Sequence, residues 1–214
     1  MMKVIRFPVN PFAMNSYIYY DENTGDGVIF DPAVFAPEEK EKLKEIIRDN
    51  KISIKYIINT HGHIDHILGN KFAKEIFGVP IYMHKDDEFL LDNAQKQAEM
   101  MGISIDEQPK TDEYLTEDSV IEFGGTKLRF IHTPGHSPGS VCAIDDENKY
   151  AFSGDVVFKD SIGRTDLAGG DMDTLLDSIQ NKLFKECDDD FTLLPGHMEV
   201  TNVRDEKANN PFLQ

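Results

Sequence analysis

Three of the seven histidines lie within six residues, in the segment Thr60-His61-Gly62-His63-Ile64-Asp65-His66. Imidazole and carboxylate groups are the usual protein ligands of zinc, iron and manganese. A helix would place His61 and His63 about 200° apart, whereas residues i and i+2 of an extended backbone share a face. We therefore expect a loop that follows a strand, with Gly62 allowing unusual backbone angles and with Asp65 and His66 just before the next helix. The dense cluster indicates a metal site.

Three further candidate ligands follow later β-type runs. They are His136 in Thr133-Pro134-Gly135-His136-Ser137, Asp155 in Ser153-Gly154-Asp155 and His197 in Leu194-Pro195-Gly196-His197. Loops at strand ends are held rigidly by the sheet and commonly carry ligand and catalytic groups. We therefore expect four segments to deliver ligands to one edge. The other two histidines, His84 and His132, are expected to be surface residues or satisfied core residues.

The number of donors indicates how many ions bind. The candidates offer five imidazoles and two carboxylates, whereas a catalytic zinc takes about three protein ligands and a water. Two ions that share a bridging ligand therefore fit better than one. Two divalent ions about 3.5 to 4 Å apart can lower the pKa of a shared hydroxide and polarise a carbonyl group. Zinc is the expected ion, with iron or manganese as alternatives.

The elements that must position these ligands alternate along the chain. Short runs rich in Val, Ile, Phe and Tyr predict strands at 4–7, 17–20, 28–30, 56–58, 81–83, 127–132, 141–144, 150–152 and 191–194. Apolar spacing predicts a surface helix after Pro37 and helices at 67–77, 85–101 and 174–184, with a long irregular connection at 103–119. No linker separates the two halves, so we expect a single two-part α/β domain over residues 1–214.

Composition excludes several classes of function. The chain has 22 basic and 39 acidic residues, and its net charge of −17 opposes binding to nucleic acid or to an anionic membrane surface. The N-terminal residues lack the apolar run of a signal peptide, so we expect a cytoplasmic protein. Cys142 and Cys187 are expected to be buried, reduced thiols because two cysteines are too few for a disulfide framework.

The motifs together resemble a known family. The strings Thr-His-Gly-His-Ile-Asp-His, Thr-Pro-Gly-His-Ser-Pro-Gly, Ser-Gly-Asp and Pro-Gly-His are similar, in this order, to the metal-binding motifs of the metallo-β-lactamase superfamily. The resemblance runs through nearly the whole chain and implies an αββα sandwich, two mixed sheets flanked by helices, whose halves meet at the site. It also implies the ligands: His61, His63 and His136 for the first ion, Asp65, His66 and His197 for the second, and Asp155 between them.

Two segments narrow the resemblance to short glyoxalase II-like hydrolases: Ser161-Ile162-Gly163-Arg164-Thr165-Asp166-Leu167 and Asn210-Pro211-Phe212-Leu213. This implies hydrolysis of a thioester such as S-lactoylglutathione (the hydroxyacylglutathione hydrolase reaction) by a hydroxide that bridges the two ions. Asp65 is the candidate catalytic residue, since a free carboxylate oxygen can orient the hydroxide or move its proton. Full-length glyoxalase II has a C-terminal helical region that contacts glutathione. We expect this chain to lack that region. Its expected partner is therefore a small-molecule acyl-thiol substrate, and the sequence does not identify the thiol.

Some residues near the expected site have two interpretations. Arg164 either contacts a substrate carboxylate or, as we prefer, anchors its turn by binding backbone carbonyls and a neighbouring Asp. Asn15 and Tyr17 are equally consistent with a role in the pocket and with a role outside it. Met198, Glu199 and Val200 follow His197 where relatives commonly carry a glycine, and this bulkier, acidic rim is expected to narrow the pocket or disfavour anionic substrates.

The main alternative activity is that of a persulfide dioxygenase, which shares the histidine motif and a Gly-Arg-Thr-Asp segment. A single Fe(II) would then use His61, His136 and Asp155 and leave sites open for O₂ and the persulfide. A lactonase is a further alternative because a lactone carbonyl presents the same chemistry. A β-lactamase is disfavoured by the missing signal peptide and a nuclease by the charge. A non-catalytic descendant of the fold would be expected to have lost ligands, and all seven are present.

Overall fold

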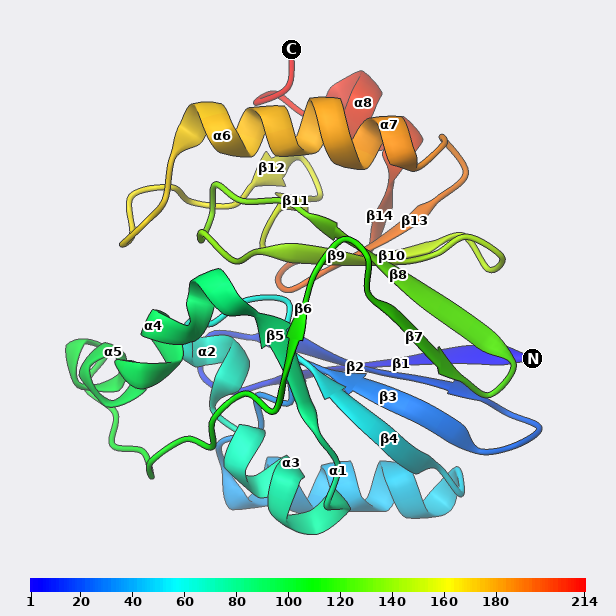
Figure 1. Cartoon of the computed structure of the whole chain (residues 1–214), viewed down its shortest axis with the longest axis vertical. Helices are drawn as coiled ribbons and strands as arrows, with labels where there is room; N and C mark the ends of the chain where they lie inside the picture. Colours follow the sequence, from blue (N-terminus) through cyan, green and yellow to red (C-terminus); the bar gives the residue numbers. More distant parts are fainter.

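The computed structural model describes residues 1–214, and the first half of the chain forms a six-stranded sheet in the order β1-β2-β3-β4-β5-β6. Strands β1 to β3 pair antiparallel, and β3 to β6 pair parallel. Helices α1 (Pro37–Asp49) and α3 (Asn70–Phe77) cover the outer face of this sheet (Figure 1). The strands are β1 (Met2–Val9), β2 (Met14–Asp21), β3 (Asp26–Phe30), β4 (Ser53–Ile58), β5 (Ile81–His84) and β6 (Glu113–Leu115).

The second half forms another six-stranded sheet in the order β14-β13-β10-β9-β8-β7, in which only β10 and β13 are parallel. Helices α6 (Met172–Asp177), α7 (Phe184–Glu186) and α8 (Val203–Asn209), with the π-helical stretch η2 (Ser178–Leu183) between α6 and α7, lie on its outer side (Figure 1). The strands are β7 (Val120–Phe123), β8 (Thr126–His132), β9 (Val141–Asp145), β10 (Tyr150–Gly154), β13 (Thr192–Pro195) and β14 (Thr201–Asn202).

Short elements complete the chain between these layers. Helix α2 (Ile64–Ile67) contacts α4 (Glu88–Asp92) and α5 (Ala94–Met100), and the 3-10 turn η1 (Lys85–Asp87) leads into α4. These helices gather on the left of the molecule in Figure 1. A separate two-stranded hairpin, β11 (Val157–Phe158) and β12 (Ser161–Ile162), follows β10. None of the helices combines the length and the apolar composition that crossing a bilayer requires.

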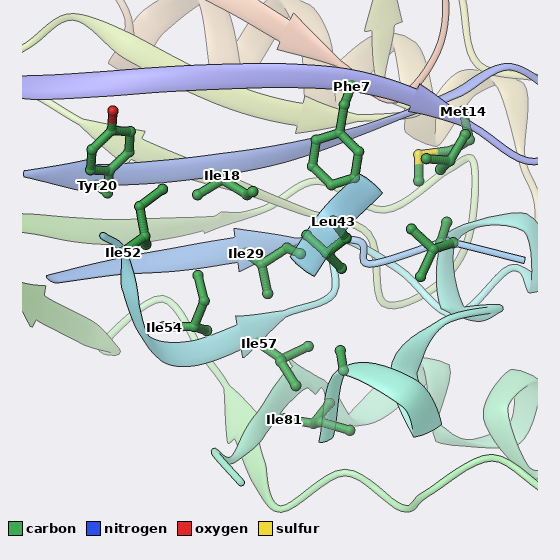
Figure 2. Packing of buried hydrophobic residues seen from close by; sticks show 14 residues of the cluster. Phe7, Met14, Ile18, Tyr20, Ile29, Leu43, Ile52, Ile54, Ile57 and Ile81 are labelled. Atoms are coloured by element: carbon green, nitrogen blue, oxygen red, sulfur yellow. The ribbon is translucent and has the colours of Figure 1, made fainter. Parts of the chain in front are cut away.

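Alternation along the strands builds the layers. In β2, Ile18 and Tyr20 pack toward the helices of the first half, whereas Tyr17 and Tyr19 pack toward the second sheet, as expected of side chains that point to opposite faces. Figure 2 shows the first of these cores, in which Ile18 and Tyr20 lie with residues such as Leu43 of α1. The sandwich is therefore a four-layer αββα arrangement, and the predicted fold class is confirmed.

Aromatic and polar contacts join the two sheets. The ring of Phe30 in β3 stacks on that of Phe152 in β10, with centroids 4.0 Å apart and an interplanar angle of 14°. The Tyr19 hydroxyl donates a hydrogen bond of 2.6 Å to the buried carboxylate of Asp145, which also accepts one of 2.6 Å from Thr126. The interface between the sheets is therefore specified by shape and by satisfied hydrogen bonds.

The predicted elements are mostly confirmed, with instructive errors. All nine predicted strands coincide with or overlap observed ones. The helix predicted at 67–77 is interrupted at Leu68 and Gly69, where Gly69 lies against the Pro32 carbonyl oxygen with no room for a side chain. The helix at 85–101 is divided among η1, α4 and α5, and the connection at 103–119 contains β6. Strands β7, β11, β12 and β14 and helix α8 were not predicted.

Candidate metal centre

All seven candidate ligands come together at one end of the sandwich. His61 and His63 lie in the loop after β4, His136 lies in the β8–β9 loop, and His197 follows β13. Asp155 directly follows β10, and because β10 and β13 are parallel neighbours, Asp155 and His197 leave the sheet at the same edge. Asp65 and His66 lie inside α2, so their expected place before the helix is wrong.

The first group consists of His61, His63 and His136. Nε2 of His136 lies 2.8 Å from Nδ1 of His63 and 3.2 Å from Nε2 of His61. All three residues are buried, and their rings meet at 81° to 87°. Three imidazoles with nitrogens aimed at one point form the ligand set typical of a catalytic zinc.

The second group consists of Asp65, His66 and His197, and Asp155 stands between the two groups. Oδ2 of Asp65 lies 3.1 Å from Nε2 of His197 and 3.9 Å from Nε2 of His66. Oδ1 of Asp155 lies 3.3 Å from Nε2 of His66, while its Oδ2 lies 3.6 Å from Nε2 of both His136 and His197. The structure therefore places Asp155 where one carboxylate reaches both groups.

The residues present fit divalent ions on independent grounds. Oδ1 of Asp155 and Nε2 of His66 are buried and, although 3.3 Å apart, make no hydrogen bond of good geometry with each other or with another group. Buried polar atoms are rarely left unpaired, so these two atoms indicate a missing ligand. Within each group the ligand atoms lie within 4.8 Å of one another. Imidazole and carboxylate donors in this number suit zinc, iron or manganese.

Hydrogen bonds behind the ligands fix which nitrogen of His66 and of His136 faces the centre. Nδ1 of His66 lies 3.0 Å from Oδ2 of Asp31, and Nδ1 of His136 lies 2.8 Å from the Arg164 carbonyl oxygen. Asp31 also accepts hydrogen bonds from the Thr60 hydroxyl at 2.7 Å and the Thr60 amide at 2.8 Å. Such partners orient ligating histidines and tune their affinity for metal.

A second buried carboxylate, Asp87 of η1, joins the two loops that carry the first group. It accepts hydrogen bonds from the Gly62 amide at 2.8 Å, the Ser137 hydroxyl at 2.7 Å and the Gly139 amide at 2.6 Å. Burial raises the pKa of Asp87, and these three donors oppose that rise. Gly62 does not adopt a positive φ, contrary to expectation. A glycine is required at this position because Asp87 of η1 and Leu90 of α4 lie too close to leave room for a side chain.

His61, His63 and Asp155 have pKa values that favour the protonation states that bind metal. Burial, together with the neighbouring histidines, holds the pKa of His61 well below its ordinary value and lowers that of His63 to about 3. Burial alone would raise the pKa of Asp155, but the nearby His66, His136 and His197 outweigh it and lower that pKa. Burial opposes charge on His66 and His197 as well, but the neighbouring carboxylates outweigh it and raise the pKa of both. Neutral imidazoles and ionised carboxylates are the forms that coordinate metal ions.

Comparison with known proteins agrees with this geometry. Residues 9–197 match the family model described as the metallo-beta-lactamase superfamily. The chain belongs to the metallo-β-lactamase superfamily. This assignment and the complete ligand set support a metal-dependent hydrolase.

Individual members of the superfamily are similar over their whole length. The chain is 34% identical to the hydroxyacylglutathione hydrolase GloC of Haemophilus influenzae, a match that covers 99% of this chain and 98% of that one. The solved structure of the BLEG-1 B3 metallo-beta-lactamase is 34% identical with a TM-score of 0.89, covering 100% of this chain and 99% of the other. TTHA1623, solved in a di-iron-bound form, is 31% identical with a TM-score of 0.86, covering 98% and 100%.

The metal centre of this superfamily member opens into a cavity of about 620 Å³. This volume lies within the range of about 300 to 1,000 Å³ that is usual for small-molecule sites. Five of the candidate ligands line it: His63, Asp65, His136, Asp155 and His197. The ligands therefore face a space in which a substrate can reach them.

Three residues with two interpretations are now placed. Neither Asn15 nor Tyr17 lines the cavity: the Tyr17 hydroxyl donates to the Pro195 carbonyl at 2.8 Å, and Asn15 Nδ2 donates to the carbonyls of Pro195 and Met198. Both hold the loop that carries His197. Arg164 pairs with Asp166, as expected. Its side chain is nevertheless 61% exposed, lines the cavity and binds no backbone carbonyl, so the expectation that Arg164 is an internal anchor of its turn is wrong.

The remaining histidines form a pair of their own. His84 and His132 stack with centroids 4.1 Å apart and an angle of 10°. Nε2 of His132 bonds the Pro138 carbonyl oxygen at 2.7 Å, and Nδ1 of His84 accepts a hydrogen bond from the Asp86 amide. One nitrogen of each ring is therefore satisfied, as expected, although ligand atoms of His84, His132 and the exposed Asp86 also lie within 4.8 Å of one another. The two thiols, Cys142 and Cys187, are buried and free as expected.

Sequence reasoning missed Asp31 and Asp87. Asp31 carries a weak signal, since it directly follows a predicted strand as the other ligand-bearing residues do. Asp87 lies in a run of charged residues that indicates only a helix surface, and nothing in the sequence separates it from Asp86. Their partners lie between 25 and 52 residues away along the chain, so only the fold reveals their role.

Proposed function

We propose that this chain hydrolyses thioesters of small acyl-thiols with two divalent ions, of which zinc is the expected one. One observation carries the proposal: two groups of three candidate ligands lie on either side of Asp155, the seventh, and the centre opens into a substrate-sized cavity. The similarity to the hydroxyacylglutathione hydrolase GloC over 98% of its length supports thioesters as the substrate class.

The two groups of candidate ligands would each hold one ion. His61, His63 and His136 would hold one ion, and Asp65, His66 and His197 the other, with Asp155 in reach of both. When bound, such a pair of ions supplies a water of lowered pKa and withdraws electrons from the acyl carbonyl. Asp31 and the Arg164 carbonyl keep His66 and His136 in the tautomer that presents Nε2 to the centre.

Asp65 is the residue that can move the proton. Its carboxylate lines the cavity, and Oδ2 lies 3.1 Å from Nε2 of His197. Nearby His66 and His197 lower the pKa of Asp65 although burial opposes this, so the carboxylate is ionised and can accept a proton. No lysine or cysteine lines the cavity to serve as a general acid. A thiolate needs no strong acid to leave, which favours a thioester over an amide.

The deciding experiment measures metal content and turnover on the same freshly purified sample. We expect about two metal ions per chain and hydrolysis of S-lactoylglutathione or of a simpler thioester. The His61→Ala variant removes a ligand of the first group and is expected to lose both metal and turnover. Metal-replete protein that hydrolyses no thioester would contradict the proposal.

A panel separates the other candidates. Because the BLEG-1 metallo-beta-lactamase is 34% identical, a chromogenic cephalosporin belongs in the panel, together with lactones. The di-iron form of TTHA1623 is a reason to test iron-loaded protein as well. Persulfide dioxygenase activity would use His61, His136 and Asp155 with a single iron and would consume O₂. The complete second group of Asp65, His66 and His197 is compatible with both activities, so metal content and oxygen uptake decide between them.

A further inference from the structure

The cavity wall beyond the ligands is largely apolar. Nine of the seventeen residues that line the cavity are hydrophobic, and five of the remaining eight are candidate metal ligands. The apolar residues come from both halves of the chain: Phe12, Leu90, Met100, Met101, Phe158, Ile162, Leu167, Ala168 and Met198. A wall of this composition gains binding free energy from apolar groups that it removes from water.

The same wall offers almost nothing to an anionic substrate. Arg164 is the only Lys or Arg side chain that lines it, and Asp166 already binds its guanidinium at two points, 2.7 and 2.8 Å. The amide of Gln97 is occupied by backbone groups, donating to the Leu90 carbonyl at 2.7 Å and accepting from the Ile64 amide. The net charge of −17 adds a repulsive field. Apart from the metal ions, the two carboxylates of glutathione would therefore find no cationic side chain in the wall that is without an acidic partner.

Met198 is the most unusual residue of the wall. It directly follows His197, and its φ of 65° lies in the left-handed region that favours glycine. Asn15 holds this backbone by donating to the carbonyls of Pro195 and Met198 at 3.0 and 2.9 Å. The residue is 54% exposed and lines the cavity, so burial in the core does not explain it. A long apolar side chain kept in a strained backbone beside a metal ligand indicates a role in the site.

Building on the proposed thioester hydrolysis, we propose that the cavity selects substrates whose flanking groups are uncharged and apolar, and that Met198 is a specificity-determining residue. The substrate class is then a neutral acyl-thiol with an alkyl or aryl group. The metal ligands act on the scissile carbonyl, and the apolar wall binds the group beside it.

The first test measures binding without turnover. Straight-chain alkanoates from butanoate to decanoate, which resemble the acid product, are titrated calorimetrically into the zinc-loaded protein. We expect the Kd to fall about fourfold for each added methylene, the equivalent of about 0.8 kcal/mol per buried CH₂. Met198→Gly and Met101→Ala are each expected to weaken this dependence. A Kd that is independent of chain length would overturn the proposal.

A matched control separates wall contacts from backbone strain. Lys51 also adopts a positive φ of 55° and is exposed in a turn outside the cavity. Lys51→Gly relieves the same kind of strain and is expected to leave the chain-length dependence unchanged. Equal losses in Lys51→Gly and Met198→Gly would show that the effect is not one of the wall.

The second test compares one acyl group on two thiols, N-acetylcysteamine and glutathione. We expect kcat/KM to be at least tenfold higher for the uncharged thiol at low salt. Equal or faster hydrolysis of the glutathione thioester would overturn the specificity proposal and leave thioester hydrolysis standing. If neither thioester is hydrolysed but alkanoates bind with the expected dependence, the function fails and the apolar selectivity of the cavity stands.

Discussion

Asp31→Asn is the sharpest test of how this fold prepares its metal centre. Oδ2 of Asp31 faces two donors, Nδ1 of His66 at 3.0 Å and the Thr60 hydroxyl at 2.7 Å, while Oδ1 faces the Thr60 amide at 2.8 Å. An asparagine has one oxygen and one NH₂, so in either orientation its NH₂ meets at least one of these donors. The hydrogen bond that is lost is charge-assisted and worth about 1.5–3 kcal/mol.

If His66 loses its partner, its ring is no longer fixed for binding. Loss of such an orienting group typically weakens metal binding or activity about 10–100-fold, which equals about 1.4–2.7 kcal/mol. We expect Asp31→Asn to bind zinc more weakly by this factor, measured by competition with a chromophoric chelator. Far-UV circular dichroism of the metal-free variant checks that it is folded.

Asp145→Asn is the matched control. Asp145 is also fully buried and accepts hydrogen bonds from Tyr19 and Thr126, but it lies between the sheets and contacts no candidate ligand. We expect this variant to lose about 1–3 kcal/mol of unfolding free energy and to keep its zinc affinity. The reasoning is refuted if Asp31→Asn binds zinc like the wild type, or if both variants weaken zinc binding equally.

Three further outcomes are expected. His197→Gln removes a ligand of the second group only, so elemental analysis should find about one ion per chain in place of two. Phe152→Ala empties the space between the sheets and should lower the unfolding free energy by about 3–5 kcal/mol in urea, with zinc stoichiometry unchanged. Burial and the stacked His132 lower the pKa of His84 below its ordinary 6.5. As the pH falls below about 6.5, the His84 imidazole is therefore protonated in the unfolded state before it is protonated in the folded state, and the folded state loses stability. The metal-free His84→Gln variant should therefore lose less stability than the metal-free wild type between pH 6.5 and 5; an equal loss would contradict this.

The sequence predicts the parts of this molecule that repeat a local pattern. Runs such as 17–20 alternate between two buried faces, and the histidine motifs are dense enough to be seen without neighbours. Short strands that form only beside a neighbouring strand were not predicted. Strand β6 has three residues and pairs only with β5, and β14 has two residues and pairs only with β13. Their backbones extend because a sheet edge offers hydrogen bonds, and no local composition encodes that edge.

The same distinction holds within the candidate site. His61 and His63 can be recognised from the local motif. Asp31 and Asp87 act through hydrogen bonds to residues far along the chain, which the sequence does not reveal. Met198 shows a third case, because its identity is visible in the sequence but its left-handed backbone is not. Sequence reasoning therefore finds groups suited to bind a metal, and the structure adds those that orient them and those that line the cavity.

The two halves of the chain are joined twice, by independent means. The first half contributes His61, His63, Asp65 and His66, and the second contributes His136, Asp155 and His197, so bound ions would cross-link the halves. A buried core of aromatic and aliphatic side chains joins the same sheets without using any ligand. Since this core supplies the apolar burial that stabilises folded domains, the site is held in shape before an ion arrives. Metal affinity and fold stability should then respond to different substitutions.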